Sequence, residues 1–120
     1  GVAGLIVSNT TIARPAALRS ALKGEAGGLS GAPLFERSTA VLRACFRAAR
    51  GTGLGLVGVG GVASGAQAYA KIRAGAALVQ LYTGFAYGGP AVVPRIKREL
   101  AALLARDGVA RVGDAVGADA

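Results

Sequence analysis

Several residue types that build common functional sites are missing or scarce in this sequence. It contains no histidine and a single cysteine, Cys45, which excludes a disulfide framework and the usual zinc sites. Charged residues make up 17% of the 120 residues and apolar types 52%, which excludes a disordered, highly charged segment. No apolar run reaches the roughly 18 residues that a membrane-spanning helix needs, and no signal-peptide pattern is visible.

The start of the sequence has the pattern of a domain interior. The first residue is Gly1 rather than methionine, and residues 2–7 already read as a buried strand. Because a natural chain seldom begins inside a core strand, we expect a fragment of a single domain.

Acidic residues are few, so the net charge is +8, which invites a nucleic-acid or acidic-lipid interpretation. The positions of the basic residues argue against it. Arg43, Arg47 and Arg50 follow helical spacing, and a second basic group at 95–106 lies among helical apolar residues. No Phe or Tyr is interleaved to stack on bases. We therefore expect solvated helix faces and no nucleic-acid partner.

Short apolar runs alternate with segments of helical periodicity. The patterns predict strands at 3–8, 54–59 and 77–82, helices at about 33–50, 65–74 and 90–107, a loop at 83–89 and a loosely patterned tail at 109–120. Ser64 is the expected N-cap of the second helix. Such alternation gives parallel strands joined by right-handed crossovers, and continuous apolar runs indicate strands buried on both faces.

The predicted fold class is α/β, and it is incomplete. A full eight-stranded α/β barrel needs roughly 250 residues, and this chain holds about three of its units. Three parallel strands alone leave two bare edges and an uncovered face, which is an aggregation liability.

Ligands of parallel α/β folds bind at the carboxyl ends of the strands. The residues expected there are all neutral: Ser8, Asn9, Thr10, Thr11, Gly60, Gly61, Tyr82 and Thr83. No Asp, Glu, His or Lys is placed among them to act as a general base. If the protein is an enzyme, we expect the proton-transfer residue to lie outside this chain.

The segment 58–63 formally matches the G-x-G-x-x-A dinucleotide fingerprint. Residues 62–98 contain no acid to hold a ribose, which disfavours a nicotinamide cofactor. The amides of Gly60 and Gly61, which lead to a helix N-terminus, can instead donate to a phosphate, and Tyr82-Thr83-Gly84 could add more amides and a hydroxyl. The alternative is that these glycines only permit tight turns.

Two other polar or reactive positions also allow a purely structural interpretation. Asn9 and Thr10 either cap a turn or bind a flat cyclic amide or carboxylate, because an Asn amide offers a donor and an acceptor in one plane. Cys45 lies on an apolar helix face, and we expect it to be a packing residue.

Four collinear motifs make the chain resemble a known family. They are Ser8-Asn9-Thr10-Thr11, the loop Gly27–Leu34, Gly58–Val62 and Gly75–Thr83. Together they resemble the carboxyl-terminal third of the dihydroorotate dehydrogenases, flavin enzymes of pyrimidine synthesis. The loop 28–34 and the run from Tyr82 to Pro90 resemble the membrane-associated, quinone-reducing class.

The resemblance implies a fold, a cofactor and site residues. Residues 1–120 would form the carboxyl-terminal three βα units of a single FMN-binding (β/α)8 barrel domain. Asn9 and Thr10 match residues that hold dihydroorotate or orotate. The positions that match FMN contacts are Ser8 (usually Thr in the family), Gly31, Gly60, Gly61, Tyr82 and Thr83.

The resemblance also implies parts that this chain does not hold. The family's catalytic base would be a serine on an upstream loop, and a flavin-contacting lysine would lie upstream too. Amino-terminal helices would dock a peripheral enzyme on a bacterial cell membrane or the mitochondrial inner membrane. The parent protein would oxidise dihydroorotate through FMN and a quinone, and the 120 residues alone would be inactive.

Two alternatives to this assignment stay open. One is a soluble FMN barrel enzyme similar to dihydroorotate or dihydropyrimidine dehydrogenases. The other is a basic, non-enzymatic binding module in which the motifs have decayed.

Overall fold

The computed structural model describes all residues from 1 to 120 and contains one parallel sheet. Its strands are β1 (Gly4–Val7), β2 (Gly55–Val59) and β3 (Leu78–Gln80), in the order β1-β2-β3. The helices are α1 (Phe35–Ala48), α2 (Gly65–Arg73), α3 (Thr83–Gly88) and α4 (Val92–Arg106), with short 3-10 turns η1 (Ala32–Leu34) and η2 (Val112–Ala115). The predicted strands and main helices are confirmed in place and order, with shorter strands.

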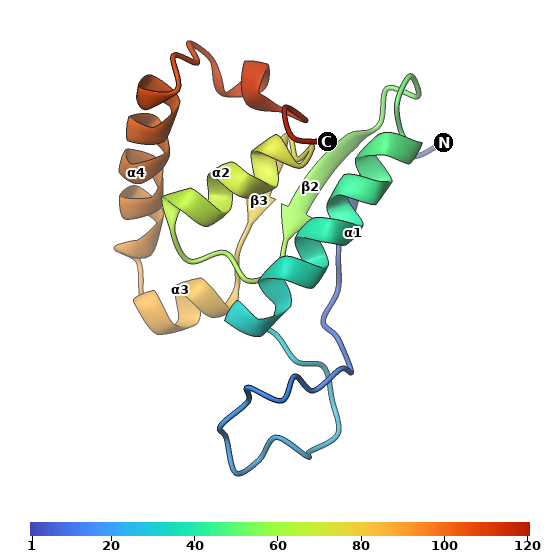
Figure 1. Cartoon of the computed structure of the whole chain (residues 1–120), viewed down its shortest axis with the longest axis vertical. Helices are drawn as coiled ribbons and strands as arrows, with labels where there is room; N and C mark the ends of the chain where they lie inside the picture. The colour runs from blue at the N-terminus through green and yellow to red at the C-terminus, as the bar shows by residue number, and fades with distance from the viewer.

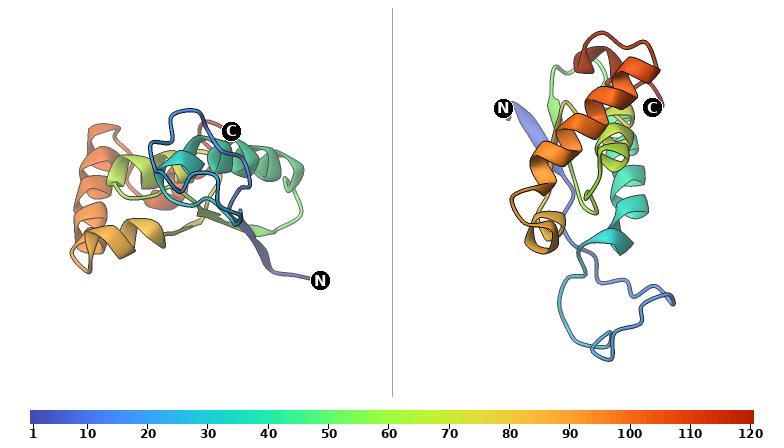
Figure 2. Two further views of the ribbon diagram at one scale, coloured as in Figure 1. Left: turned by 90° about the horizontal axis from the view of Figure 1, so that it is seen from below. Right: turned by 90° about the vertical axis from the view of Figure 1, so that its left-hand side faces the viewer.

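Helices cover one face of the sheet (Figures 1 and 2). Val7, Gly58 and Val79 are aligned across the three strands and face these helices. A Cβ on Gly58 would lie 3.0 Å from Leu42 Cδ2 and 3.3 Å from Lys71 Cβ, so the glycine lets α1 and α2 approach β2 closely. α4 packs against α2 at the side of this layer.

The other face of the sheet is bare. Ile6, Val57 and Leu78 are aligned across it, and Ile6 and Leu78 are 65% and 66% exposed. The expected uncovered face is therefore confirmed. The expectation of strands buried on both faces is wrong for these residues, because no segment of the chain lies over the second face.

The helix ends show one prediction confirmed and one corrected. Ser64 caps α2, and its Oγ accepts a hydrogen bond from the Gln67 N–H at 3.3 Å. The segment predicted as a loop at 83–89 instead forms α3. Glycines give it low helix propensity, but a Cβ on Gly84 would clash with the Val62 carbonyl, so close packing on the preceding loop holds it in place.

The connection from β1 to α1 makes a long excursion beyond the carboxyl ends of the strands (Figure 1). Thr11 and Leu29 close it with two backbone hydrogen bonds of 3.1 and 2.7 Å. The Arg14 guanidinium fills its interior and donates to the carbonyls of Thr11, Ile12, Ala13, Lys23, Glu25 and Gly27. The chain thus returns to the strand ends at Ser30 and Gly31.

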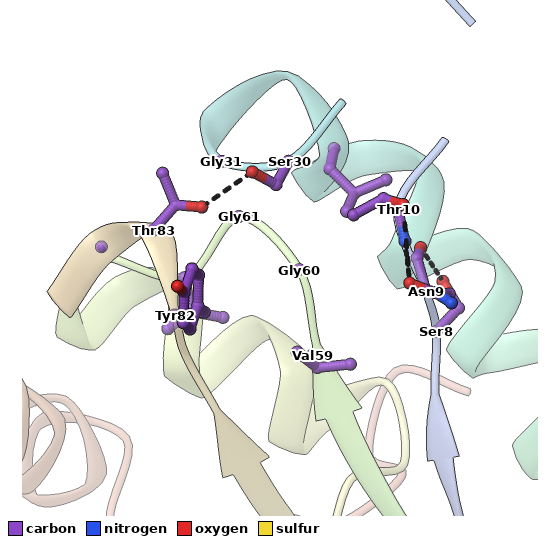
Figure 3. Close-up of a pocket in the computed structure, with 13 residues that line it drawn as sticks. Ser8, Asn9, Thr10, Ser30, Gly31, Val59, Gly60, Gly61, Tyr82 and Thr83 are labelled. Atoms are coloured by element: carbon purple, nitrogen blue, oxygen red, sulfur yellow. Dashed lines mark hydrogen bonds between the residues drawn. The ribbon is translucent and has the colours of Figure 1, made fainter. Parts of the chain in front are cut away.

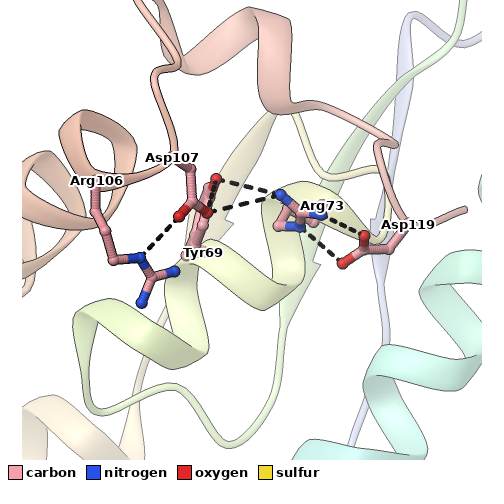
Figure 4. A network of polar contacts seen from close by, with 5 residues as sticks. All are labelled: Tyr69, Arg73, Arg106, Asp107 and Asp119. Atoms are coloured by element: carbon pink, nitrogen blue, oxygen red, sulfur yellow. Dashed lines mark hydrogen bonds and ion pairs between the residues drawn. The ribbon is translucent and has the colours of Figure 1, made fainter.

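The carboxyl-terminal tail docks on the opposite end of the molecule (Figure 1), and Figure 4 shows its polar contacts there. Arg73 makes a two-pronged hydrogen bond to Asp119, at 2.8 and 2.6 Å. Tyr69 donates to Asp107 at 2.9 Å, and the N–H of Gly117 donates to Ile72 O. The segment expected to be loosely patterned therefore has a fixed place against α2.

On α1, Arg43 is more buried than a solvated helix face predicts, whereas Cys45 has the expected packing role. Arg47 and Arg50 are exposed as predicted, but Arg43 is half-buried and its Nε has no hydrogen-bond partner. Cys45 is half-buried and packs against the cluster around Leu42, which agrees with a packing role.

Candidate functional site

A cavity of about 210 Å3 lies at the carboxyl ends of the three strands (Figure 3). The structure brings all eight site residues that the sequence predicts to this one cavity: Ser8, Asn9, Thr10, Gly31, Gly60, Gly61, Tyr82 and Thr83. They converge because parallel strands present their carboxyl ends at one edge of a sheet. Gly84, expected as a further amide donor, also lines it, whereas Thr11 does not. The lining includes four residues that the sequence analysis did not assign: Ser30, Leu34, Val59 and Val62. No charged side chain lines it.

The turn after β2 presents backbone donors to this cavity. Gly60 and Gly61 have φ angles of 102° and 76°, which favour glycine. A Cβ on Gly61 would lie 2.5 Å from Phe35 Cβ, so the turn packs directly on the first turn of α1. The N–H groups of Gly60, Gly61 and Val62 make no hydrogen bond within the chain.

Side chains occupy several backbone donors at the start of α2. The Ala63 N–H donates to Gln67 Oε1 at 2.8 Å, and the Gly65 N–H donates to the Glu99 carboxylate at 2.6 Å. Side chains thus accept from the N–H groups of Gly65 and Gln67 in the first turn of α2. The unpaired donors of the glycine turn lie just before this helix, and their assignment to a phosphate stays a prediction.

A hydrogen bond between the start of α3 and the loop before η1 closes one side of the cavity (Figure 3). Thr83 Oγ1 donates to Ser30 Oγ at 2.9 Å. Gly31 has a φ of 78°, and a Cβ there would lie 3.0 Å from Thr83 Cγ2. The sequence placed Ser30 in a motif but gave no signal for this contact, because 53 residues separate the two partners.

The segment after β1 leaves polar groups available. Asn9 Oδ1 accepts from the Thr10 N–H at 2.8 Å, which is the turn-capping role considered above. Asn9 Nδ2 has no hydrogen-bond partner within the chain. Ser8 Oγ donates weakly to Asn9 O at 3.4 Å, and Tyr82 is 82% exposed. The bond from the Thr10 N–H thus fixes the amide plane of Asn9 and leaves its NH₂ group without a partner within the chain.

One titratable group lies behind the cavity. Lys71 is fully buried, and burial lowers the pKa of its ammonium to about 8, while the nearby Glu36 carboxylate raises it. Its Nζ donates to Ser38 Oγ at 2.5 Å. Neither Lys71 nor Ser38 was assigned to the site from the sequence.

Comparison with known proteins identifies the family of this arrangement. The family model described as dihydroorotate dehydrogenase matches residues 1–104. The chain belongs to the dihydroorotate dehydrogenase family. The resemblance that rests on the four motifs is therefore confirmed, and members of this family are generally flavin-dependent.

The curated relatives are quinone-dependent enzymes. The chain is 64% identical over 119 residues to the dihydroorotate dehydrogenase (quinone) of Azorhizobium caulinodans, covering 99% of this chain and 33% of the relative. It is 52% identical to the mitochondrial dihydroorotate dehydrogenase (quinone) of Mus musculus, covering 99% of this chain and 30% of the relative. The chain thus spans about a third of the length of these relatives.

Solved structures agree on the fold. A crystal structure of ligand-free DHODH from Eimeria tenella matches with a TM-score of 0.93 and 45% identity, over 98% of this chain and 32% of that one. This enzyme is a TIM barrel, so the three βα units of the chain are a part of such a barrel, as predicted. None of the helices combines the length and the apolar character that crossing a bilayer requires.

Proposed function

We propose that the protein containing this chain oxidises dihydroorotate to orotate, with FMN as cofactor and a quinone as electron acceptor, in the de novo synthesis of pyrimidines. The observation that carries the proposal is the convergence of eight expected site residues on one neutral cavity. The names of the relatives favour this quinone-reducing class over the soluble flavin enzymes. Residues 1–120 would be the carboxyl-terminal part of a single barrel domain.

The cavity suits the phosphate of FMN. Its lining carries no carboxylate that would repel an anion, and the glycine turn offers unpaired N–H donors. Backbone N–H groups of this kind bind phosphate oxygens well. We assign the phosphate to Gly60, Gly61, Tyr82 and Thr83, and further flavin contacts to Ser8 and Gly31.

Asn9 and Thr10 are proposed to orient the substrate ring. The bond from the Thr10 N–H fixes the Asn9 amide plane and leaves Nδ2 free to donate, while Oδ1 retains acceptor capacity. A planar amide of this kind fits the carbonyl and N–H edge of dihydroorotate. Because Asn9 is held by its own neighbour, it needs little reordering when a ligand binds.

The chemistry that bound FMN supplies is acceptance of a hydride from dihydroorotate and delivery of the electrons to a quinone. We assign binding and orientation to the residues of this chain, because no Asp, Glu, His or Lys lines the cavity and the resemblance to the family gives Ser8 a flavin contact. We assign proton removal from dihydroorotate to a serine outside these 120 residues, and a further flavin contact to a lysine outside them.

We also propose a peripheral location at an inner membrane, through a segment outside these 120 residues. Support comes from the relatives named as mitochondrial and as quinone-dependent, since quinones partition into membranes. Whether this membrane is bacterial or mitochondrial depends on the source of the chain.

The decisive experiment is an absorbance spectrum of the full-length gene product, followed by release and identification of its cofactor. We expect FMN in nearly one-to-one amount, and dihydroorotate-dependent reduction of a soluble quinone. The isolated 120 residues should show no such activity. A colourless full-length protein, or one that carries a nicotinamide cofactor instead, would overturn the proposal.

A further inference from the structure

Lys71 is the one fully buried charged side chain, and it forms no ion pair. Its ammonium donates to Ser38 Oγ at 2.5 Å and lies 5.3 Å from the centroid of the Phe35 ring. Burying an ammonium group without a counter-ion is unfavourable. An aliphatic side chain would fill the same space between α1 and α2 without that cost. Packing alone therefore does not explain why a lysine stands at this position.

The Ser38 hydroxyl connects this charge to the glycine turn. Ser38 Oγ lies 3.0 Å from Phe35 O and 3.1 Å from Gly60 O, and it has one hydrogen to donate. Phe35 O already accepts from Thr39 Oγ1 at 2.7 Å. Gly60 O has no other donor. The Ser38 hydroxyl therefore donates to Gly60 O. The Lys71 ammonium donates to a lone pair of Ser38 Oγ and thereby polarises the O–H bond of Ser38.

This contact sets the direction of a backbone donor in the cavity. The carbonyl of Gly60 and the N–H of Gly61 belong to one planar trans peptide unit, so they point in opposite directions. Anchoring Gly60 O on Ser38 turns the Gly61 N–H away from α1. Two successive glycines leave this peptide plane free to rotate unless something holds it. In Figure 3 the turn lies at the rim of the cavity.

We propose that Lys71 is a positioning residue for the phosphate subsite. Acting through Ser38, it holds the peptide plane between Gly60 and Gly61 so that the Gly61 N–H faces the phosphate of the cofactor. Its buried positive charge lies behind the same turn and favours an anion there. This inference rests on the proposed function, because it takes the phosphate of FMN as the ligand of the turn.

The test compares FMN with riboflavin, which lacks the phosphate, as ligands of the flavin-stripped full-length protein. In Lys71→Met and in Ser38→Ala, the preference for FMN over riboflavin should fall about tenfold, the effect of one misdirected charge-assisted hydrogen bond. Thr39→Val is the matched control, since Thr39 is a buried neighbour in α1 whose hydroxyl bonds only to Phe35 O. It should keep the wild-type preference.

Each outcome bears on a different claim. A wild-type preference in both Lys71→Met and Ser38→Ala would overturn the positioning role, as would an equal loss in Thr39→Val, which would indicate general loosening of α1. Should Lys71→Met fail to fold, Ser38→Ala decides the question alone. If the wild-type protein binds riboflavin as tightly as FMN, the phosphate subsite of the proposed function fails instead.

Discussion

The two ends of the sheet use polar groups in opposite ways. At the amino ends of the strands, charged side chains satisfy one another: Arg73 pairs with Asp119, and Asp107 accepts from Tyr69 and Arg106 (Figure 4). At the carboxyl ends, the cavity has a neutral lining, and the backbone donors of the glycine turn have no partner within the chain (Figure 3). The same three βα units thus carry charged side chains that are paired with one another at one end, and backbone N–H groups without partners at the other.

This difference indicates that the amino ends of the strands serve stability and the carboxyl ends serve binding. In α/β barrels the carboxyl-terminal face carries function and the amino-terminal face carries stability. Here the amino-terminal network fixes the tail on α2, whereas the carboxyl-terminal donors are available to a ligand. Lys71 is buried like a core residue, but it is connected through Ser38 to the glycine turn at the carboxyl ends of the strands.

The largest effect is expected from a side chain at the glycine turn. In Gly61→Ala, a Cβ 2.5 Å from Phe35 Cβ would force the turn to shift, and the flavin content of the folded full-length protein should fall at least about tenfold. Gly51→Ala is the control, because Gly51 has nearly the same φ of 77° but no atom within 4 Å of its Cβ position. It should lose about 1 kcal/mol of stability and keep its flavin. Full flavin occupancy in Gly61→Ala would argue against the phosphate subsite.

Removal of the substrate-orienting amide should affect ligand binding without affecting folding. Asn9→Ala in the full-length protein should weaken orotate binding by about 1–3 kcal/mol, measured by titration of the flavin spectrum. The unfolding temperature and the flavin content should not change, since Asn9 is exposed and its side chain bonds only to its neighbour Thr10. Unchanged orotate affinity would remove Asn9 from the substrate clamp.

The amino-terminal network should show the converse behaviour. The hydrogen bond between Arg73 and Asp119 raises the pKa of Arg73 and lowers the pKa of the Asp119 carboxyl. Both charged forms are therefore favoured when the tail is docked on α2. Arg73→Ala should lower the thermal unfolding midpoint by a few degrees and speed proteolysis of the tail, without changing the FMN-over-riboflavin preference. Arg47→Ala, on an exposed part of α1, serves as the control. A loss of flavin preference in Arg73→Ala would contradict the separation of the two ends.

A dependence of stability on pH is also expected. Lys71 has a pKa of about 8 in the folded protein and 10.5 when unfolded, because burial outweighs the attraction of Glu36. Between these values unfolding takes up a proton, so rising pH favours the folded state. The stability of the wild type relative to Lys71→Met should therefore increase from pH 8 to pH 10, as measured by denaturant unfolding. A difference that stays constant would show that Lys71 is not desolvated.

What the sequence predicts well depends on local or topological rules. Apolar runs and the Ser64 cap are local signals, and the residues that follow each strand must meet at one edge of a parallel sheet. Ser8, Gly60 and Thr83 are examples of positions that this rule places at the cavity. The family resemblance added Gly31, which no periodicity singles out.

What the sequence misses depends on contacts between distant residues. Lys71 reaches Ser38 across 33 residues, and nothing in the local pattern tells a buried lysine from a solvated one. The N–H of Gly65 donates to the carboxylate of Glu99, 34 residues away, and no local pattern indicates this bond. The helix α3 forms against its own propensity because Gly84 packs on the loop after β2.

The most direct test of the central claim is a crystal structure of the full-length protein with its cofactor bound. The account predicts FMN phosphate oxygens about 3 Å from the N–H of Gly61 and from groups of Thr83, with the Gly60 carbonyl still bonded to Ser38. A phosphate held elsewhere, with the glycine turn in contact only with solvent or protein, would contradict it.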